Sequence, residues 1–527
     1  MSPGPSIQVC HGDTVRVKVK NQLQDGGSLT IHWHGIHQFN TVWADGVPMI
    51  TQCPIPSSTF FVYEFVADPP GTHWWHSHVG VQRGDGLYGA LIVREPRQKE
   101  FNSKEYDFDL PQHYMLFNDW LGISSLDLYL LAIANAVPSS GYTDTMLING
   151  RSHNRDIDMD VPITVFEVEQ GFRYRMRIVD ASFSECIVRI TVESHPITII
   201  ATDGFEMEPV REVDALYFTA GERVDFVLEA SAKPSTYCIY VVGIPNPVCP
   251  AIGAAKLKYK NSPTMDVNCT QYNTEQRDFF STAVLKDNDT DVYTFKDTHA
   301  LQPVDPALYH VDTVYYVVMG VSYYSYTSNR PEAGTTHSPF FTMNQVQFDF
   351  PDKPFVSFEP NGNVDSCRTY PGYNNTELAE CNNTHCSCPL VAKVKLGQVV
   401  EFVVIDDVHI INHPMHLHGQ SFRLLAQGLK NISADELIEF DKTHGLPRIP
   451  LESAVVKDTV NIISGGYVII RWKAENPGYW FFHCHVEYHS LAGMAMIIQV
   501  GEEDEIPNPP KGFPTCGSFT PGEEEKS

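Results

Sequence analysis

Short runs in which apolar and polar residues alternate recur along most of the chain, and turn-forming residues separate them. Examples are "DTVRVKVKNQL" (13–23), "RYRMRIVD" (173–180) and "YVIIRWKA" (467–474). Alternation with a period of two predicts strands that bury one face. Helical periodicity is scarce, and "SSLDLYLLAIANA" (124–136) is the best candidate for a helix. The pattern therefore predicts an all-β protein built from several β-sandwiches.

The length and composition of the chain indicate that these strands belong to several domains. The chain has 527 residues, 43% of them hydrophobic, which allows three or four folded domains. The polar segment "RQKEFNSKEYD" (97–107) and an irregular region around 260–310 are typical of linkers. We expect a first domain over residues 1–100, a second over 101–262, a linker over 263–310 and a third over 311–527.

Charge and cysteine content limit the partners and the compartment. The 37 basic and 64 acidic residues give a net charge of −27, which argues against nucleic acid as a partner. No apolar run is long enough to span a membrane. Twelve cysteines and five Asn-X-Ser/Thr sequons predict a secreted, disulfide-bonded glycoprotein. The sequons begin at Asn268, Asn288, Asn374, Asn382 and Asn431.

Four His-X-His pairs are the strongest chemical signal in the sequence. Two pairs lie near the N-terminus and two near the C-terminus. Residues two apart in a strand point to the same face, so each pair directs two imidazoles to one place. One such pair is often a surface accident, but four together supply enough ligands for several metal ions. The pairs are His32 with His34, His76 with His78, His416 with His418, and His483 with His485.

Cys484 lies between the two histidines of the last pair. If His483 and His485 face a metal cluster, Cys484 must face the opposite side of the strand. It therefore belongs to a second, separate site. One peptide segment would then join the two sites and provide a through-bond path for electrons.

The residues around Cys484 complete this second site. A thiolate with two imidazoles and a weak axial thioether is the ligand set of a blue copper centre. His489 and Met494 supply one imidazole and the thioether. We expect the other imidazole from His413, because Pro414 is unsuited to the middle of a strand and lets His413 turn away from His416.

Two other metal assignments fit less well. Structural zinc sites use several cysteines in closed tetrahedra, whereas one cysteine accompanies ten histidines here. A binuclear oxygen carrier would have no use for Cys484.

The segments that carry these residues resemble the signatures of the multicopper oxidases, laccase type. The four signatures are matched in order by "IHWHGIHQFNTVWADGVPMITQCPI", "GTHWWHSHVGVQRGDGLYGALIV", "HPMHLHG" and "NPGYWFFHCHVEYHSLAGM". "CNNTHCSCP" and "FPTCGSF" look most like laccases of invertebrates. The similarity covers nearly the whole chain and is weak in roughly 265–340. It also suggests that the family's first strands and a signal peptide are missing ahead of residue 1.

The resemblance implies three consecutive cupredoxin-like domains, each a Greek-key β-sandwich, and four copper ions. A type 1 copper lies in the third domain, and a trinuclear cluster lies between the first and third. The second domain then has no copper ligands. By position, the type 1 ligands are His413, Cys484, His489 and the axial Met494, and the type 2 ligands are His32 and His416. The type 3 pair takes His34, His76, His78, His418, His483 and His485.

The family reaction implied by the resemblance is the one-electron oxidation of phenols or diphenols, coupled to reduction of O2 to water. Asp45 in "WADG" matches the family's acid near the type 2 copper. Glu487 in "HCHVE" lies between the two sites, and both acids are candidate proton relays. Glu185 falls roughly where related enzymes place a substrate-binding acid. For each of these acids an ordinary solvated carboxylate is the alternative.

Two other functions stay open at this stage. A ferroxidase of the same family would oxidise Fe2+, and carboxylates lining the type 1 site would favour it; Asp406 and Asp407 are nearby in the sequence. A non-catalytic copper-binding protein with an incomplete cluster is the second alternative. The presence of all ten histidines and Cys484 argues against it, whereas the missing first strands keep it open.

Disulfide pairing is only partly predictable. Cys53 and Cys516 match a disulfide of related laccases. We also expect Cys10 to pair with Cys186, and Cys238 with Cys249. The connectivity among Cys367, Cys381, Cys386 and Cys388 cannot be predicted from the sequence.

Overall fold

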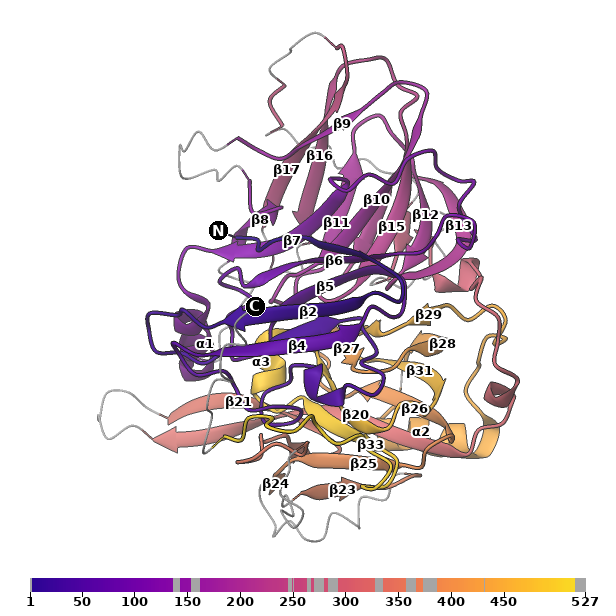
Figure 1. Ribbon diagram of the computed structural model, residues 1–527. Helices are drawn as coiled ribbons and strands as arrows, with labels where there is room; N and C mark the ends of the chain where they lie inside the picture. Colours follow the sequence, from indigo (N-terminus) through magenta and orange to yellow (C-terminus); the bar gives the residue numbers. More distant parts are fainter. Residues whose placement is uncertain are drawn as a thin grey trace.

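Figure 1 shows the computed structural model of the chain. The described residues are 2–135, 143–152, 162–244, 249, 251–262, 267–269, 279–282, 292–327, 335–356, 366–372, 386–430 and 432–516. Four sequon residues and one cysteine fall outside them, namely Asn288, Asn374, Asn382, Asn431 and Cys381.

The N-terminal part consists of two small sheets packed on one core. The four-stranded sheet has the order β1 (Ile7–Cys10), β6 (Tyr88–Arg94), β5 (Gly71–Ser77) and β3 (Ile31–His34). The other sheet pairs β2 (Thr14–Lys20) with β4 (Phe60–Val66). β2 alternates between apolar and charged residues because one face packs on the core and the other faces solvent. Trp33, Tyr63 and Phe65 pack together in that core.

The middle part forms one thirteen-stranded sheet among the described residues. Its order is β13-β12-β15-β10-β7-β8-β17-β16-β11-β14-β18-β19, and β9 pairs with β17. β18 and β19 lie in the segment expected as a linker, and β18 pairs in parallel with β14. The strands are β7 (Tyr114–Leu121), β8 (Thr143–Ile148), β9 (Val165–Val168), β10 (Arg173–Asp180), β11 (Val188–Val192), β12 (Ile197–Thr202), β13 (Phe205–Val213), β14 (Ala215–Phe218), β15 (Arg223–Glu229), β16 (Thr236–Gly243), β17 (Ile252–Tyr259), β18 (Phe279–Ser281) and β19 (Val292–Tyr293).

The C-terminal part packs an eight-stranded sheet on a six-stranded sheet. The orders are β24-β22-β21-β20-β26-β31-β28-β29 and β23-β25-β33-β32-β27-β30. The strands are β20 (Thr313–Thr327), β21 (Thr335–Met343), β22 (Val346–Gln347), β23 (Cys367–Thr369), β24 (Cys386–Ser387), β25 (Leu390–Val394), β26 (Val399–Asp406), β27 (His413–Leu417), β28 (Phe422–Leu429), β29 (Val456–Lys457), β30 (Thr459–Ile462), β31 (Gly466–Lys473), β32 (Gly478–Cys484) and β33 (Ala495–Val500).

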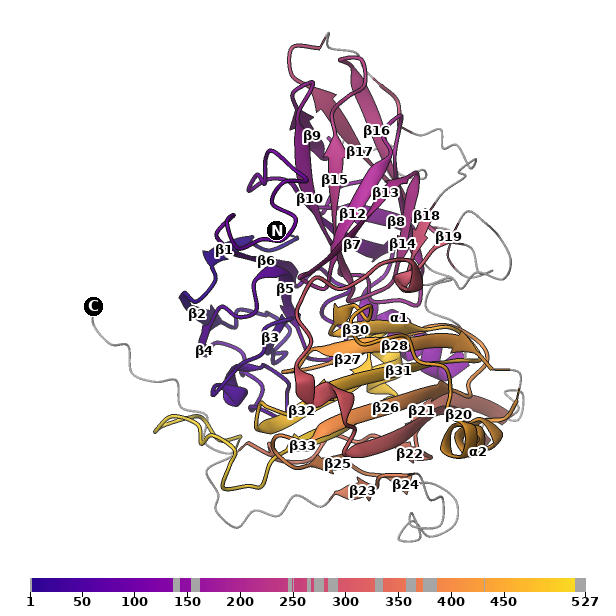
Figure 2. The same cartoon turned by 90° about the vertical axis from the view of Figure 1, so that its right-hand side faces the viewer.

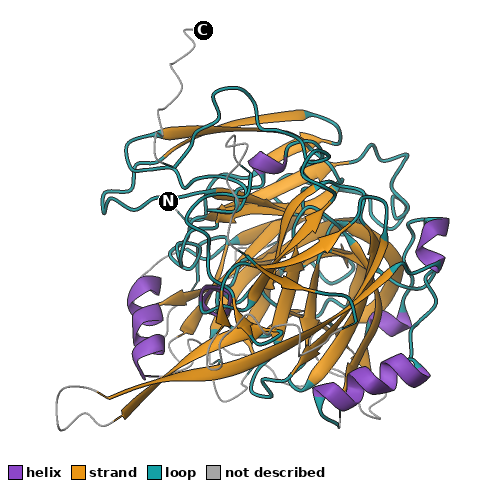
Figure 3. Ribbon diagram, turned by 90° about the horizontal axis from the view of Figure 1, so that it is seen from below, coloured by secondary structure: helices purple, strands orange, loops and turns teal. Residues whose placement is uncertain are grey.

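Helices are few and lie at the margins of the sheets (Figure 3). The sequence prediction of a helix at 124–136 is confirmed by α1 (Ser125–Asn135). α2 (Ala434–His444) begins at a capping box in which the Ser433 hydroxyl accepts from the Glu436 amide. The remaining helical elements are α3 (Glu487–Leu491), η1 (Val42–Ala44), η3 (Phe295–Asp297) and η4 (Pro306–Tyr309). Among the described residues, no helix combines the length and apolar character needed to cross a bilayer.

The N-terminal strands lie between the other two parts of the molecule. In Figure 1 the indigo strands β2, β4, β5 and β6 have the magenta middle sheet above them and the orange and yellow C-terminal strands below. Figure 2 shows the same arrangement from the side, with β3 facing the end of the C-terminal sheets near β27 and β30. Sequence segments from the two ends of the chain therefore meet.

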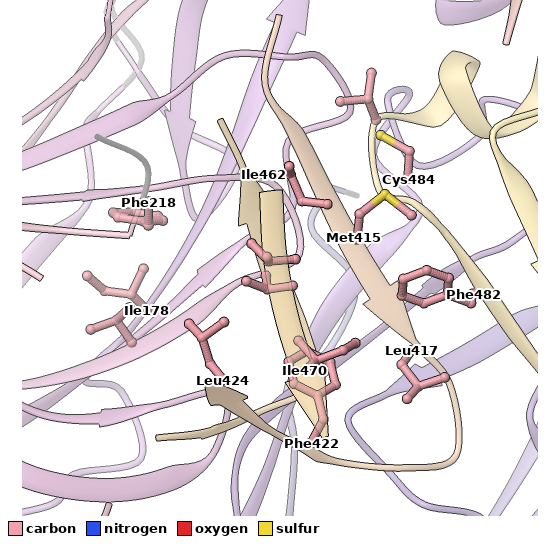
Figure 4. Close-up of a cluster of buried hydrophobic side chains, with 14 of the residues drawn as sticks. Ile178, Phe218, Met415, Leu417, Phe422, Leu424, Ile462, Ile470, Phe482 and Cys484 are labelled. Carbon is pink, nitrogen blue, oxygen red and sulfur yellow. The ribbon is translucent and has the colours of Figure 1, made fainter. Parts of the chain in front are cut away.

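The hydrophobic interior of the C-terminal part reaches the strand that carries Cys484. Figure 4 shows Cys484 beside Met415, with Phe482 and Leu417 further along the same two strands. Met415 is the register partner of Cys484, and both are fully buried. The prediction of an all-β fold with strands at 13–23, 173–180 and 467–474 is confirmed.

Four disulfides are found among the described residues, and they correct two expected pairings. Cys53 pairs with Cys516, as predicted. The predictions of Cys10–Cys186 and Cys238–Cys249 are wrong, since Cys10 is exposed at the end of β1 and forms no disulfide. Cys186 lies in the buried core of the middle part, where Cys249 reaches it, and bridging requires this proximity. The bridges are Cys53–Cys516, Cys186–Cys249, Cys238–Cys269 and Cys367–Cys388.

Asp180, at the end of β10, is a buried acid with incomplete hydrogen bonding. Oδ1 accepts a hydrogen bond of 2.9 Å from the Ser182 amide, and Oδ2 has no partner. Burial raises the pKa of Asp180 to about 7. The folded protein therefore binds this proton more tightly than the unfolded chain, so the contribution of Asp180 to stability is present at low pH and is lost as the pH rises through 7.

Asp180→Asn should remove this pH dependence, because the amide keeps the acceptor for Ser182 and cannot ionise. We expect the variant to gain stability over the parent as the pH rises from 4 to 7, by on the order of 3 kcal/mol, with no further gain above pH 8. Urea unfolding of both proteins at pH 4.5, 6, 7 and 8.5 measures the difference. A stability difference that is the same at all four pH values would contradict the role of Asp180.

Candidate metal centre

Two pairs of strands bring the eight predicted cluster histidines together. In the N-terminal sheet, β3 pairs with β5 so that His32 stands opposite His76. In the C-terminal sheet, β27 pairs with β32 so that His416 stands opposite His483. The two sets meet across the boundary between the sheets. The pairs that lead from one set into the other are His34 with His416, with ring centres 3.7 Å apart, and His32 with His418, with ring centres 3.9 Å apart.

The converging nitrogen atoms form groups of three that could each hold a metal ion. Within each group all ligand atoms lie within 4.8 Å of one another. Nδ1 of His34 also lies 3.2 Å from Nε2 of His485, and Nε2 of His418 lies 3.1 Å from Nε2 of His483. The groups are His32, His416 and His418; His32, His34 and His76; and His78, His418 and His483.

Hydrogen bonds orient three of these rings so that one nitrogen of each faces the cluster. Nδ1 of His32 donates to the Asp45 carbonyl, and Nδ1 of His416 donates to the Asp458 carbonyl. Nδ1 of His76 donates to the Ser77 carbonyl. The other nitrogen then presents a lone pair, and carbonyl partners of this kind are what hold metal-binding histidines.

Burial keeps the imidazoles neutral, which is the form that binds metals. It is the largest cause of a lowered pKa at seven of the eight histidines, and the pKa of His418 falls to about 3. The Nε2 atoms of His32, His76, His78 and His416 are buried without a hydrogen-bond partner. Buried neutral imidazoles with unpaired nitrogens fit copper ions. The histidines with a lowered pKa are His34, His76, His78, His416, His418, His483 and His485.

Asp45 lies against the cluster, as expected from the sequence. Its Oδ2 accepts a 2.9 Å hydrogen bond from Nδ1 of His418, and its Oδ1 is 3.3 Å from Nδ1 of His32. Burial would raise the pKa of Asp45, but these two imidazoles outweigh burial and lower it. The carboxylate therefore stays ionised and holds two rings in place.

Asp458 is a second buried acid at the cluster, and no sequence motif pointed to it. Its carboxylate lies 3.4 Å from Nε2 of His34 and 3.5 Å from Nδ1 of His416. Arg223 in the middle part binds both carboxylate oxygens, one at 2.5 Å. Arg223 begins β15 and Asp458 lies between β29 and β30, so the pairing joins residues 235 positions apart, and no local sequence pattern predicts it.

The second predicted site is formed by His413, Cys484 and His489. Sγ of Cys484 lies 3.7 Å from Nδ1 of His413 and 3.6 Å from Nδ1 of His489, and all three side chains are buried. Burial raises the pKa of the Cys484 thiol, so a bound cation is required for it to ionise there. Met494 is fully buried, and its carbonyl accepts from the Cys484 amide at 3.1 Å.

The expectation that Pro414 lies outside a strand is wrong. It is the second residue of β27, where its carbonyl accepts a 2.6 Å hydrogen bond from the His485 amide. Simple alternation separates His413 from His416, because residues an odd number apart in a strand face opposite sides. No break in the strand is needed.

The acids expected near Cys484 differ in their surroundings. Glu185 is half-buried, and its charge is one cause of the raised pKa of the Cys484 thiol, after burial. Asp406 is buried, caps the Val408 amide at 2.9 Å and lies 3.6 Å from Nε2 of His413. Asp407 is exposed and binds Lys430 at 2.6 Å.

The segment after Cys484 holds Glu487, which is half-buried at the start of α3. Its amide donates to the Phe183 carbonyl at 3.0 Å, and its carboxylate lies 3.4 Å from Arg83. Burial raises the pKa of Glu487 to about 7. Arg83, which contacts Glu487, is a further residue of the site that was not identified from the sequence.

Gly221, in the middle part, lies directly against a ligand of the cluster. It adopts φ +88°, and a Cβ atom there would lie 2.9 Å from ring atoms of His485. Glycine is required at this position both for the backbone conformation and for the close approach of the ring.

Comparisons with known proteins agree with this geometry. Three multicopper oxidase family models match residues 1–98, 112–262 and 356–504. Laccase-1 of Fomitopsis schrenkii is 30% identical, over 94% of this chain and 81% of its own length. Laccase-7 of Arabidopsis thaliana is 30% identical, over 98% of this chain and 91% of its own length.

Solved structures show the same fold. The laccase from Botrytis aclada superimposes with a TM-score of 0.68 at 24% identity, over 97% of this chain and 84% of that one. Fet3p, titled a multicopper oxidase that functions in iron import, gives a TM-score of 0.70 at 23% identity, over 94% of this chain and 85% of that one.

Gly221→Ala tests how closely the middle part fits the cluster. A left-handed alanine costs about 1–2 kcal/mol, and the forced contact with His485 adds about 1–3 kcal/mol. We expect the variant to unfold at lower temperature and to bind less copper. Gly171→Ala is the matched control, since Gly171 has φ +87° and no atom within 4 Å of its added Cβ. Equal losses of stability and copper in both variants would contradict the contact.

Proposed function

Because the chain belongs to the multicopper oxidase family, as a laccase-like copper-dependent oxidoreductase, we propose that it oxidises phenols and diphenols and reduces O2 to water. Four substrate molecules each lose one electron and one proton, and O2 takes up four electrons and four protons to give two waters. Bound copper supplies the one-electron redox chemistry and the site of O2 reduction.

One observation carries this proposal: the end of β32 and the residue that follows it present a thiol to one side and two imidazoles to the other. Cys484 faces His413 and His489, whereas His483 and His485 face the imidazole cluster. Nδ1 of His483 also donates to the Cys484 carbonyl at 2.9 Å. Electrons taken at the cysteine site therefore have a short covalent and hydrogen-bonded path to the cluster.

The geometry supports a specific division of the copper ligands. His413, Cys484 and His489 would hold a copper ion at the cysteine site, and the buried Met494 would supply a further, weaker ligand. His32 and His416 fit the type 2 ion. The nitrogen distances and ring contacts divide the other six into two sets of three, one for each type 3 ion. The sets are His34, His76 and His485, and His78, His418 and His483.

Two acids, the buried Asp45 and the half-buried Glu487, are suited to supporting roles around these ligands. Asp45 orients His32 and His418 and offers an acceptor beside the cluster. Glu487 lies between the two sites and is the candidate to pass protons toward O2. Both roles follow from position and hydrogen bonding.

Glu185 is the candidate substrate-binding acid. Its charge reaches Cys484, and Phe341 of β21 lies over His489 with ring centres 4.4 Å apart, which gives the site an aromatic wall. A phenol could place its ring on that wall and its hydroxyl at Glu185. Oxidation of Fe2+ is the second candidate, because Glu185 and Asp406 are both acids beside the site. Asp406 is occupied as a loop cap, and this favours phenols.

Four disulfides among the described residues support secretion, because such bridges persist in oxidising compartments. The substrates would then be extracellular small molecules.

Two variants test the separation of the two sites. The parent protein should bind about four copper ions and absorb strongly near roughly 600 nm, as thiolate-copper sites of this type do. Cys484→Ser should abolish this absorption and substrate oxidation while the cluster still binds copper. His416→Ala should keep a blue site that substrate reduces, with little O2 consumption. Metal analysis, absorption and oxygen-electrode measurements distinguish these results; loss of all copper from both variants would overturn the two-site assignment.

Glu185→Gln tests the substrate class, since it removes the charge and keeps the shape. We expect kcat/KM for phenols to fall roughly 5- to 150-fold, which corresponds to about 1–3 kcal/mol for one charged hydrogen bond. The oxidation of electron donors without an ionisable proton should be unaffected. The control Glu208→Gln, at an exposed acid, should change the kcat/KM of neither class of substrate. If oxidation of Fe2+ falls most, the ferroxidase assignment is correct.

A further inference from the structure

Arg83 is a buried arginine in the loop between β5 and β6, and only 1% of it is exposed. Its guanidinium lies over the ring of Trp74, at 5.9 Å from the ring centre. Trp74 in turn packs on His76, with ring centres 4.3 Å apart. A cation has therefore been placed directly behind the ligands of the cluster.

Most of the polar contacts of Arg83 go to the segment that follows Cys484. Nη2 donates to the His485 carbonyl at 2.7 Å and lies 3.4 Å from the Glu487 carboxylate. Nη1 lies 2.8 Å from Nδ1 of His485 and 3.3 Å from its Nε2. Nε has no partner. One side chain thus holds the main chain of His485 and places its charge against the ring of the same residue.

This arrangement is costly for stability alone. Burying a guanidinium loses several kcal/mol of hydration, and its strongest contacts here are to a neutral carbonyl and a neutral ring. Its carboxylate partner is at 3.4 Å, a longer distance than that of a strong charged hydrogen bond. Arg423 shows the alternative use of a buried arginine. It binds four main-chain carbonyls, none of them from a proposed copper ligand, namely those of Leu451, Ala454, Gln302 and Pro303.

We propose that Arg83 is a positioning residue for electron delivery: it holds the carbonyl of His485, in the peptide that follows this ligand, and places a permanent positive charge beside the cluster. The inference rests on the proposed function. Holding the His485 carbonyl fixes the main chain at His485, and this determines where the ring lies at the end of the covalent path from Cys484. The charge favours the arrival of an electron at the cluster over its retention at the cysteine site, because opposite charges attract strongly in a buried region.

Arg83→Met and Arg83→Lys test the proposal with two separate rates. The first is the bleaching of the blue colour by a phenol without O2, which reports on the cysteine site. The second is the return of the colour after O2 is added, which requires delivery to the cluster. We expect bleaching to stay at the parental rate and colour return to slow roughly tenfold or more in Arg83→Met. Arg83→Lys should be intermediate, because lysine keeps the charge but cannot grip two groups.

Copper content, the blue band and thermal unfolding of the copper-free proteins accompany these rates. Arg423→Met is the matched control, which should lose stability without slowing the return of colour. If Arg83→Met binds four copper ions and its blue colour returns at the parental rate after O2 is added, the proposal is overturned. If Arg83→Met does not fold, the test rests on Arg83→Lys. Parental rates of colour return in Arg83→Lys, or loss of copper from its cluster, would each overturn the proposal. A parent protein without copper or blue colour would instead refute the proposed function.

Discussion

The alternation of side chains along β32 is the constraint on which the two sites depend. His483 and Cys484 end β32 and His485 follows directly, and these three residues point to opposite faces in turn, so one extended segment serves two sites. β27 follows the same rule, with His413 on the face of Met415 and His416 on the other. The two sites are therefore close and joined by covalent bonds without sharing a ligand. A slip of one residue in the register would exchange the two sets of side chains and destroy both sites together.

The cluster imposes a second constraint, because its ligands come from both ends of the chain. Neutral imidazoles must be collected where water is excluded, and each needs a hydrogen-bond acceptor behind it. The main chain supplies several of these acceptors, while Asp45 and Asp458 supply carboxylates from the two halves. The disulfide Cys53–Cys516 links the first sheets to the C-terminal segment, which limits separation of the halves.

Much of the fold and of the ligand set could be predicted, because both rest on local periodicity. Alternating runs predict strands, and a His-X-His pair in a strand has a determined direction. Arg83 and Asp458 were missed because their contacts join residues far apart; Arg83 and His485 are 402 positions apart in the sequence. The pairings expected for Cys10 and Cys238 failed for the same reason, since spacing does not determine which sulfurs meet in space.

The middle part shows how a region without predicted ligands still shapes the site. Arg223 binds the carboxylate of Asp458, which holds His34 and His416, and Gly221 leaves room for the ring of His485. The Phe183 carbonyl receives the Glu487 amide just beyond the cysteine strand. Each contact acts on a group that orients or adjoins a ligand. The middle part therefore fixes how the two ligand-bearing halves meet, and the precision of the cluster depends on all three parts.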